Sequence, residues 1–337
     1  MDAKKIVKIQ EQIRKIRSAV WQAHALETAV VLDLAELLAD GPLSLAAVAE
    51  RSGTHAPSLY RLLRALESDG FFSQVSPEVF ANTDASTLLR RDFPGSQRAL
   101  ILSHLSDIGG HRRVWSGLTD AVRTGNTAFE KVHGCDLWEF GRRNPEAARL
   151  FNQSMQATSS LITPAVTNAY DWQQFPVIAD IGGGIGTQLL AILDQCRNVR
   201  GLLFDKPEIA VHMLQHPRLT FLPGDFFVAV PGGADAYLLR WIMHDYADDK
   251  ACKILTTVRR AMKPGARLLV VDAVVPTGPE PSHSKWTDLL MLVVLGGCER
   301  TLDQFCSLFT SAGFQLDEVI ETGSPLKILV ASCIPSA

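Results

Sequence analysis

The stretch Asp180-Ile181-Gly182-Gly183-Gly184-Ile185-Gly186 marks the point where the chain changes its rhythm. From here onward, short apolar runs typical of strands alternate with helical segments. The predicted strands are Val177–Asp180, Arg200–Asp205, Leu219–Pro223, Asp235–Leu239, Arg267–Asp272, Phe314–Ile320 and Leu326–Ser332. Five strand–helix alternations followed by two late strands predict an open, mostly parallel α/β sheet of seven strands.

The glycine-rich turn predicts a ligand site, because ligands of open α/β sheets bind beyond the carboxyl ends of the strands. Gly182 and Gly184 allow a tight turn and a close approach of the backbone to a nucleotide-like ligand. The spacing is G-x-G-x-G, which differs from the G-x-G-x-x-G of dinucleotide sites.

Acidic residues stand at the ends of the next two predicted strands. Asp205 ends the second strand, where a carboxylate can accept hydrogen bonds from both ribose hydroxyls. Gly224-Asp225-Phe226 follows the third strand, and a carboxylate beside an aromatic ring suits an adenine. Each such residue alone is more often a turn residue or a helix cap. Three of them at three successive strand ends favour a nucleoside site.

Composition and charge narrow the class of protein. The 337 residues are 47% hydrophobic, which predicts two folded domains and argues against disorder. A net charge of −3 disfavours a dedicated nucleic-acid binder, and the lack of a run of about 18 apolar residues disfavours a membrane span. The chain begins with alternating charges rather than a signal peptide, and its six cysteines are scattered. We therefore expect a cytoplasmic protein without a zinc cluster or a disulfide framework.

The first segment, Met1–Val20, predicts a helix with an apolar seam. The seam has the 3, 4, 3, 4 spacing of a coiled coil and consists of Ile6, Ile9, Ile13, Ile16 and Val20. Six basic residues stand against two acidic ones, so the local charge is 6 − 2 = +4. An anionic surface could bind such a helix, but the unbroken seam favours packing against a partner subunit.

The next segment, Trp21–Thr83, has a winged helix-turn-helix pattern of helices followed by a hairpin. Ser44 caps a short helix over Leu45–Glu50, and the predicted strands are Phe71–Val75 and Val79–Thr83. DNA binding through the helix that bears Arg61 and Arg64 is one interpretation. The acidic balance of the chain favours the other, a dimerisation module.

The pattern is helical again from Ser103 to Tyr170. We expect a domain boundary near residue 100, with a mainly α domain over residues 1–100. The second domain, over residues 101–337, would combine a helical lid with the α/β sheet.

Five motifs resemble the class I S-adenosylmethionine-dependent O-methyltransferases. Within that class the chain looks like the group that contains plant caffeate and flavonoid, acetylserotonin and bacterial natural-product enzymes. The resemblance covers most of the chain and implies a Rossmann-like catalytic domain, an N-terminal winged-helix dimerisation domain and a homodimer. It also implies S-adenosylmethionine as cofactor, S-adenosylhomocysteine as product, a small-molecule substrate and no metal, nucleic acid or membrane. The motifs are Asp180–Gly186, Phe204–Pro207, Gly224–Phe226, Arg240–Tyr246 and Gly296–Thr301.

The resemblance implies that His244 is the general base and that Asp272 and Glu299 hold and polarise it. His244 lies just past the fourth predicted strand, at the start of a predicted helix, and Asp272 closes the fifth strand. Methyl transfer is an in-line displacement, so the protein has to align donor and acceptor. A phenol, with a pKa near 10, is a poor nucleophile at pH 7 until a base takes its proton.

The remaining site residues are also implied by the resemblance. Arg240, where the family often has Lys, and Ser159 are expected to contact the cofactor. The substrate set, for which ordinary helix packing is an equal alternative at the apolar positions, is Phe151, Met155, Asp245, Met291 and Leu295.

The sequence thus predicts an enzyme that methylates a hydroxyl oxygen of a small aromatic or enolic specialised metabolite. Three alternatives stay open at this point. The same fold could methylate nitrogen. It could use the bound cofactor for hydroxylation, decarboxylation or pericyclic chemistry. Less favoured is a winged-helix DNA-binding regulator that senses the cofactor.

Overall fold

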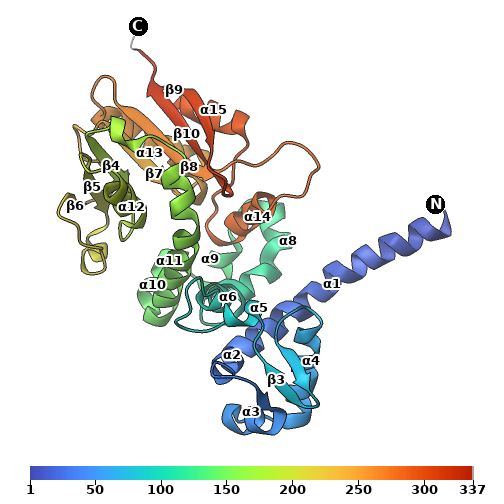
Figure 1. Cartoon of the computed structure of the whole chain (residues 1–337). Coiled ribbons are helices and arrows are strands. Elements are labelled where there is room, and N and C mark those ends of the chain that lie inside the picture. The colour runs from blue at the N-terminus through green and yellow to red at the C-terminus, as the bar shows by residue number, and fades with distance from the viewer. Residues whose placement is uncertain (336–337) are drawn as a thin grey trace. The chain divides into compact units, whose positions relative to one another are not determined.

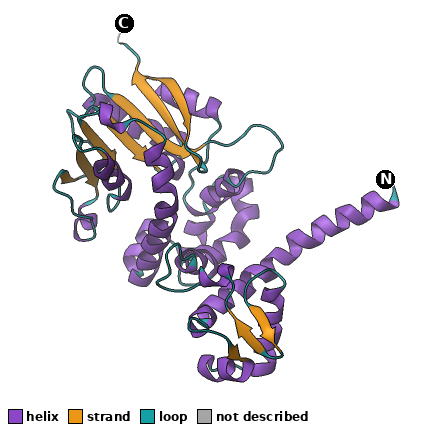
Figure 2. Cartoon of the chain, in the orientation of Figure 1, coloured by secondary structure: helices purple, strands orange, loops and turns teal. Residues whose placement is uncertain are grey.

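The computed structural model describes residues 1–335, and its chain forms two compact units (Figures 1 and 2). Unit 1 comprises Met1–Arg113 and Trp138–Ala157, and unit 2 comprises Val114–Leu137 and Thr158 onward. The chain passes between the units three times, inside the helices α7 (His111–Val114), α10 (Leu137–Arg143) and α11 (Pro145–Asn168). The predicted domain boundary near residue 100 stays a prediction.

Unit 1 begins with one long helix, α1 (Ala3–Val31), which runs to the N-terminus in Figure 1. Asp2 caps it by accepting a hydrogen bond from the Lys5 N–H at 2.8 Å. The helix does not stop after the predicted segment Met1–Val20, because nothing in Trp21–Val31 breaks it. Its C-terminal part is buried at Ala29 and Val30, whereas most side chains of its first half are exposed.

The rest of the N-terminal module agrees with the winged-helix pattern. Its helices are α2 (Leu34–Leu37), α3 (Leu45–Ser52) and α4 (Ala56–Glu67), and its strands are β1 (Leu43–Ser44), β2 (Ser73–Ser76) and β3 (Val79–Ala81). The strands form an antiparallel sheet in the order β1-β3-β2. Ser44 caps α3 as predicted, by accepting from the Ala47 N–H. Phe71 and Phe72 lie outside the hairpin, because Phe72 has a φ of 62° and turns into the core with 1% exposure.

Further helices follow, and those after residue 103 agree with the helical pattern predicted for residues 103–170. They are α5 (Asp84–Thr87), α6 (Arg98–Leu105), α7 (His111–Val114), α8 (Leu118–Thr124) and α9 (Ala128–His133), followed by α10 and α11. None of the described helices is both long and apolar enough to cross a lipid bilayer.

Unit 2 contains the predicted seven-stranded sheet, in the order β6-β5-β4-β7-β8-β10-β9. The first five strands along the chain pair in parallel, and the last two are antiparallel to their neighbours. Observed and predicted bounds differ by one residue at most. The strands are β4 (Val177–Ile181), β5 (Arg200–Asp205), β6 (Leu219–Pro223), β7 (Ala236–Arg240), β8 (Arg267–Ala273), β9 (Phe314–Glu321) and β10 (Leu326–Cys333).

Helices cover both faces of this sheet. One face packs against α13 (Asp248–Ala261) and α15 (Leu302–Ser311), and the other against α12 (Thr187–Gln195) and the end of α11. Neighbouring residues of a strand serve opposite faces, as Leu239 and Leu238 do, so the central strands are apolar throughout. The remaining helix, α14 (Ser284–Val294), packs against α8 and α9. Because these helices pack on the faces of the sheet, the polar ends of the parallel strands remain available for a site.

Candidate active site

His244 lies in a short 3₁₀ turn, Met243–Asp245, directly after β7. The chain enters this turn through Trp241, whose φ of 55° is in the left-handed region and whose N–H donates to the Val271 carbonyl on β8. Such strained backbone persists where the surroundings hold it. The long helix α13 starts only at Asp248, so His244 precedes the predicted helix instead of opening it.

Three carboxylates surround the imidazole of His244. Its Nδ1 lies 3.0 Å from Glu299 Oε1 and 3.9 Å from Asp272 Oδ1, whereas its Nε2 lies 3.3 Å from Asp245 Oδ1. The structure thus brings together the three residues that the sequence singled out as a base and its two partners. Burial opposes a charge on His244, but the three carboxylates outweigh burial and raise the pKa of His244 to about 10.

The two carboxylates on the Nδ1 side are deeply buried. Asp272 is fully buried, and Asp272 Oδ2 and Glu299 Oε2 have no hydrogen-bond partner among the described residues. Burial raises the pKa of Asp272 to about 7, against the charge of His244. Ionised carboxylates are costly in such surroundings unless a cation is near, so the imidazolium and the two acids stabilise each other.

The imidazole and carboxylate groups at this site are also side-chain types that can bind a metal ion. The ligand atoms of His244, Asp272 and Glu299 lie within 4.8 Å of one another. The 3.0 Å hydrogen bond between Nδ1 and Glu299 already accounts for the approach of the imidazole to that carboxylate.

Glu299 is held in place by backbone and side-chain contacts on both sides of it. Its N–H donates to Asp288 Oδ1 at 2.9 Å. The guanidinium of the neighbouring Arg300 is 1% exposed and donates to the carbonyl oxygens of Met243 and Tyr246, the first residue of the His244 turn and the residue after its last. Gly297 lets the two segments touch, since a Cβ there would lie 2.0 Å from the His244 carbonyl oxygen.

The glycine-rich turn lies beside the His244 turn. A Cβ at Gly182 would lie 2.6 Å from Ile242 Cδ1 and 3.4 Å from Phe226, so the glycine keeps the space between them open. Gly182 and Gly184 both have positive φ, 71° and 58°. The Gly184 N–H donates to Asp205 Oδ2 at 2.8 Å, which fixes the carboxylate against the turn. Asp225 is exposed next to Phe226.

Arg240, the last residue of β7, is held in a buried polar network. Its Nη1 donates to Thr163 Oγ1 at 2.8 Å and to Gln188 Oε1 at 3.0 Å. Its Nε and Nη2 are buried and have no hydrogen-bond partner among the described residues, although the guanidinium lies 4.7 Å from the centre of the Trp241 ring. Burial lowers the pKa of Arg240 to about 10, opposed by Asp180, so the guanidinium stays charged at neutral pH. An unpaired cationic edge beside a glycine turn fits a ligand that carries a carboxylate and a ribose.

For the other predicted site residues, the structure gives the helix on which each one lies. Ser159 lies on α11 one turn before Thr163, and Met291 and Leu295 lie at the end of α14, ahead of Glu299. Phe151 and Met155 lie on the part of α11 that belongs to unit 1, so their proximity to His244 stays a prediction.

The structure adds four residues that the sequence reasoning did not assign a role. These are Thr163 and Gln188, which hold Arg240, and Asp288 and Arg300, which hold the Glu299 segment. Arg300 could have been found, because it stands inside the motif Gly296–Thr301. Thr163 and Gln188 carry no local signal, since they lie 77 and 52 residues away from Arg240 in the sequence. Asp288 lies 11 residues before Glu299 and belongs to none of the motifs.

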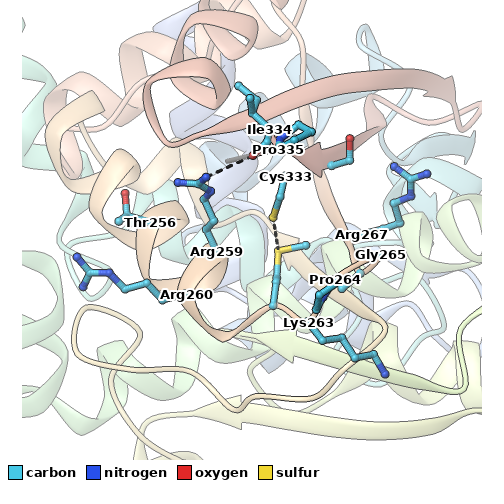
Figure 3. Close-up of a pocket in the computed structure, with 13 residues that line it drawn as sticks. Thr256, Arg259, Arg260, Lys263, Pro264, Gly265, Arg267, Cys333, Ile334 and Pro335 are labelled. Atoms are coloured by element: carbon cyan, nitrogen blue, oxygen red, sulfur yellow. Dashed lines mark hydrogen bonds between the residues drawn. The ribbon is translucent and has the colours of Figure 1, made fainter. Parts of the chain in front are cut away.

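A hollow of about 860 Å³ lies at the opposite edge of the sheet, where β8 begins and β10 ends (Figure 3). Lys263 pairs with Asp235, and Arg267 pairs with Asp317. Arg259 and Arg260 stand in the last turn of α13, where the helix dipole favours cations. Helix capping and ion pairing thus account for the basic lining of this hollow.

Comparison with known proteins identifies the family. A model of the O-methyltransferase domain matches residues 115–315, and a model of the O-methyltransferase dimerisation domain matches residues 16–92. Phenazine O-methyltransferase from Lysobacter antibioticus is 38% identical over 318 residues, with 92% of each chain covered. 3-Amino-4-hydroxybenzoate 4-O-methyltransferase from Streptomyces cremeus is 35% identical, with 90% of this chain and 85% of that protein covered.

Solved structures agree with these relatives. LaPhzM superimposes with a TM-score of 0.90 at 37% identity, over 97% of this chain and 99% of that chain. Human N-acetylserotonin methyltransferase in complex with SAM gives a TM-score of 0.86 at 27% identity, over 96% and 97%. The N,N-8-amino-8-demethyl-D-riboflavin dimethyltransferase of Streptomyces davawensis gives 0.81 at 30% identity, over 96% and 98%. The chain therefore belongs to the O-methyltransferase family.

Proposed function

We propose that this enzyme transfers the methyl group of S-adenosylmethionine to a hydroxyl oxygen of a small aromatic or enolic metabolite, with His244 as general base. The observation that carries the proposal is the contact of His244 Nδ1 with Glu299 at 3.0 Å, beside a glycine-rich turn at the carboxyl ends of the strands. The aromatic substrates named for the relatives, a phenazine and an aminohydroxybenzoate, support this substrate class.

The cofactor supplies an electrophilic methyl group on a sulfonium, and the protein supplies alignment and a base. His244 Nε2 takes the hydroxyl proton, and the oxygen becomes the nucleophile for in-line displacement. The three carboxylates raise the pKa of His244, which makes its neutral imidazole a stronger base toward a phenol, whose usual pKa is about 10. Asp272 and Glu299 stabilise the imidazolium that forms.

We propose the cofactor residues on the same grounds. We assign Gly182 and Gly184 to the close backbone approach and Asp205 to the ribose hydroxyls. Gly224-Asp225-Phe226 would contact the adenine. The unpaired edge of Arg240 suits the carboxylate of the cofactor, and Ser159 would lie on the same side of α11 as Thr163, which holds Arg240. Phe151, Met155, Met291 and Leu295 are proposed as apolar walls for the acceptor.

We also propose that the N-terminal module binds a second copy of the chain, and not nucleic acid. The match to a dimerisation domain over residues 16–92 supports this. The free cysteines, none of them disulfide-bonded among the described residues, agree with a cytoplasmic location.

Methylation of nitrogen is the second candidate. The dimethyltransferase among the structural neighbours is named for an amino substrate, at 30% identity. An amine is already nucleophilic when neutral, so it depends less on His244.

Incubation with methyl-labelled S-adenosylmethionine and a panel of phenols, hydroxyquinones and arylamines tests both candidates. We expect label on oxygen, and a loss of about 10²–10⁴-fold in turnover for His244→Ala with cofactor affinity retained. Dialysis against a chelator is expected to leave turnover unchanged, which separates the base from a metal site. Full activity of His244→Ala, or label on nitrogen alone, would overturn the proposal.

A further inference from the structure

Three buried side chains of unit 2 form a closed ring of hydrogen bonds with Arg240. Arg240 Nη1 donates to Thr163 Oγ1 at 2.8 Å and to Gln188 Oε1 at 3.0 Å. Gln188 Nε2 donates to Thr167 Oγ1 at 2.8 Å, and the Thr167 hydroxyl donates to the Thr163 carbonyl oxygen at 2.8 Å, which closes the ring. Thr163, Thr167 and Gln188 are 5%, 5% and 3% exposed, so solvent water has little access to these contacts.

This ring fixes the orientation of the Arg240 guanidinium. A rotation about its Nε–Cζ bond would break both hydrogen bonds of Nη1. The guanidinium also contacts the ring of Trp241, whose centre lies 4.7 Å from Cζ. The edge that remains consists of Nε and Nη2, which are buried and have no hydrogen-bond partner among the described residues.

The unpaired edge of Arg240 calls for an acceptor from outside the chain. Among the described residues, Asp180 interacts with Arg240 through its charge, but it makes no hydrogen bond with Nε or Nη2. The Asp180 carboxylate lies against the glycine-rich turn, since a Cβ at Gly183 would lie 2.6 Å from its Oδ2. A guanidinium edge with two donors matches a carboxylate, which can accept from both. Buried donors without a partner cost free energy, so the edge favours ligands that carry a carboxylate over ligands that lack one.

We propose that Thr163 and Gln188 are positioning residues of the cofactor site. By holding Nη1, they present the Nε–Nη2 edge of Arg240 to the carboxylate of S-adenosylmethionine, and they thereby set the preference for a cofactor with an intact carboxylate. The inference rests on the proposed contact of Arg240 with that carboxylate. It assigns a role in binding to two side chains that do not touch the ligand themselves.

The ring also gives a physical reason for an arginine at this position, where the family often has lysine. The guanidinium has separate edges, so Nη1 can serve the ring while Nε and Nη2 stay available for a ligand. An ammonium has a single nitrogen, which would have to make both sets of contacts from one point.

Two ligands that differ only in the carboxylate measure the preference. They are S-adenosylhomocysteine and its decarboxylated form, in which the amino-acid tail is replaced by a 3-aminopropyl group. Calorimetry gives the dissociation constant of each ligand for the full-length wild type. We expect S-adenosylhomocysteine to bind about 10–100-fold more tightly, the range of a hydrogen bond to a charged group.

Variants of the ring then test whether the preference depends on the ring. Thr163→Val removes the hydroxyl that accepts from Nη1, and Gln188→Leu removes the amide that accepts from it. The guanidinium can turn in each variant, so we expect the preference for the carboxylate to fall at least about fivefold. Thr163→Ser restores an acceptor for Nη1 and is expected to keep the wild-type preference.

Thr257→Val is the matched control. Thr257 is also buried in a helix, at 6% exposure, and its hydroxyl donates to the Lys253 carbonyl oxygen. This variant is expected to leave the affinities for both ligands unchanged.

The outcomes separate the inference from the proposals on which it rests. If Thr163→Val weakened both ligands by the same factor, the role of the ring would be structural alone, and the inference would be overturned. An unchanged preference in Thr163→Val and Gln188→Leu would also overturn it, while the contact of Arg240 with the carboxylate would stand. Equal affinities of the wild type for the two ligands would overturn both, but not the proposed O-methylation.

Arg240→Lys covers the case in which neither Thr163→Val nor Gln188→Leu folds. It keeps the positive charge but replaces the two edges by one nitrogen. We expect its preference for the carboxylate to fall at least about fivefold below that of the wild type. A preference equal to that of the wild type would show that a held edge is not needed and would contradict the inference.

Discussion

At the scale of single residues, the charge around His244 controls how the reaction depends on pH. Burial disfavours the imidazolium, and the carboxylates of Asp272, Asp245 and Glu299 more than offset this, so the pKa rises from 6.5 to about 10. Only the neutral imidazole can accept a proton from the substrate. The rate of the wild type should therefore rise with pH up to the raised pKa.

Glu299→Gln removes one of the carboxylates that raise this pKa. The imidazolium loses a stabilising charge, so the pKa of His244 falls, and the neutral base is present at lower pH. We expect the acidic limb of kcat/KM to move at least about one pH unit lower, together with a lower maximum because the base is weaker. Rate profiles from pH 5 to 10 measure this, with Glu280→Gln, an exposed acid, as control. A limb that stays in place or moves to higher pH contradicts the role of Glu299.

Several site residues could be predicted because their position along the chain is informative. Asp205, His244 and Asp272 follow or end apolar strands, and parallel strands place such residues at one edge of the sheet. The partners of Arg240 could not be predicted. Thr163 and Gln188 lie 77 and 52 residues away from it, and a hydrogen bond between distant polar side chains leaves no periodic pattern.

At the scale of elements, the strands were predictable and some helix bounds were not. The central strands are buried on both faces, so they read as continuous apolar runs. By contrast, α1 extends to Val31 although the character of its sequence changes after Val20, because packing against α4 and α6 supports its second half. Phe72 has a strand-like side chain but a left-handed backbone, and burial of its ring outweighs its strand propensity.

The contact between the Glu299 segment and the His244 turn depends on one glycine. A Cβ at Gly297 would lie 2.0 Å from the His244 carbonyl oxygen and 2.5 Å from the Asp245 carbonyl carbon, both of them backbone atoms. Gly297→Ala should therefore push the two segments apart and lengthen the Nδ1–Glu299 contact. We expect turnover to fall about 10²-fold and the free energy of unfolding to fall by about 1–3 kcal/mol.

The control for this prediction is Gly232→Ala. A Cβ at Gly232 would lie 3.6 Å from the Ala261 carbonyl oxygen, which is an ordinary contact. Turnover, calorimetric affinity for S-adenosylmethionine and denaturant unfolding are measured for both variants. If Gly297→Ala turned over like Gly232→Ala, the close approach of the two segments would not matter for catalysis.

At the scale of the whole molecule, the exposed apolar side chains on the first half of α1 predict that another helix packs against it. Ile13, Ile16 and Val20 are 60%, 68% and 58% exposed in the single chain, and they share one face with Ile6 at 39%. Isolated helices of this length are marginal in water, and a stripe of large apolar side chains is typical of an interface between helices. The match to a dimerisation domain begins at residue 16, within this stripe.

We expect the wild type to be a dimer with twice the mass of the 36.9 kDa chain in light-scattering chromatography. Ile13→Asp combined with Ile16→Asp places two charges in the apolar seam and should yield the mass of one chain, because burying each unpaired carboxylate costs more than the apolar contact gains. Lys8→Asp changes the charge of an exposed residue outside the seam, so this variant should remain dimeric.

A dimer that persists in the double variant would place the interface elsewhere. A monomer that also appears for Lys8→Asp would mean that the basic face of the helix, which carries most of the +4 charge of residues 1–20, holds the two chains together.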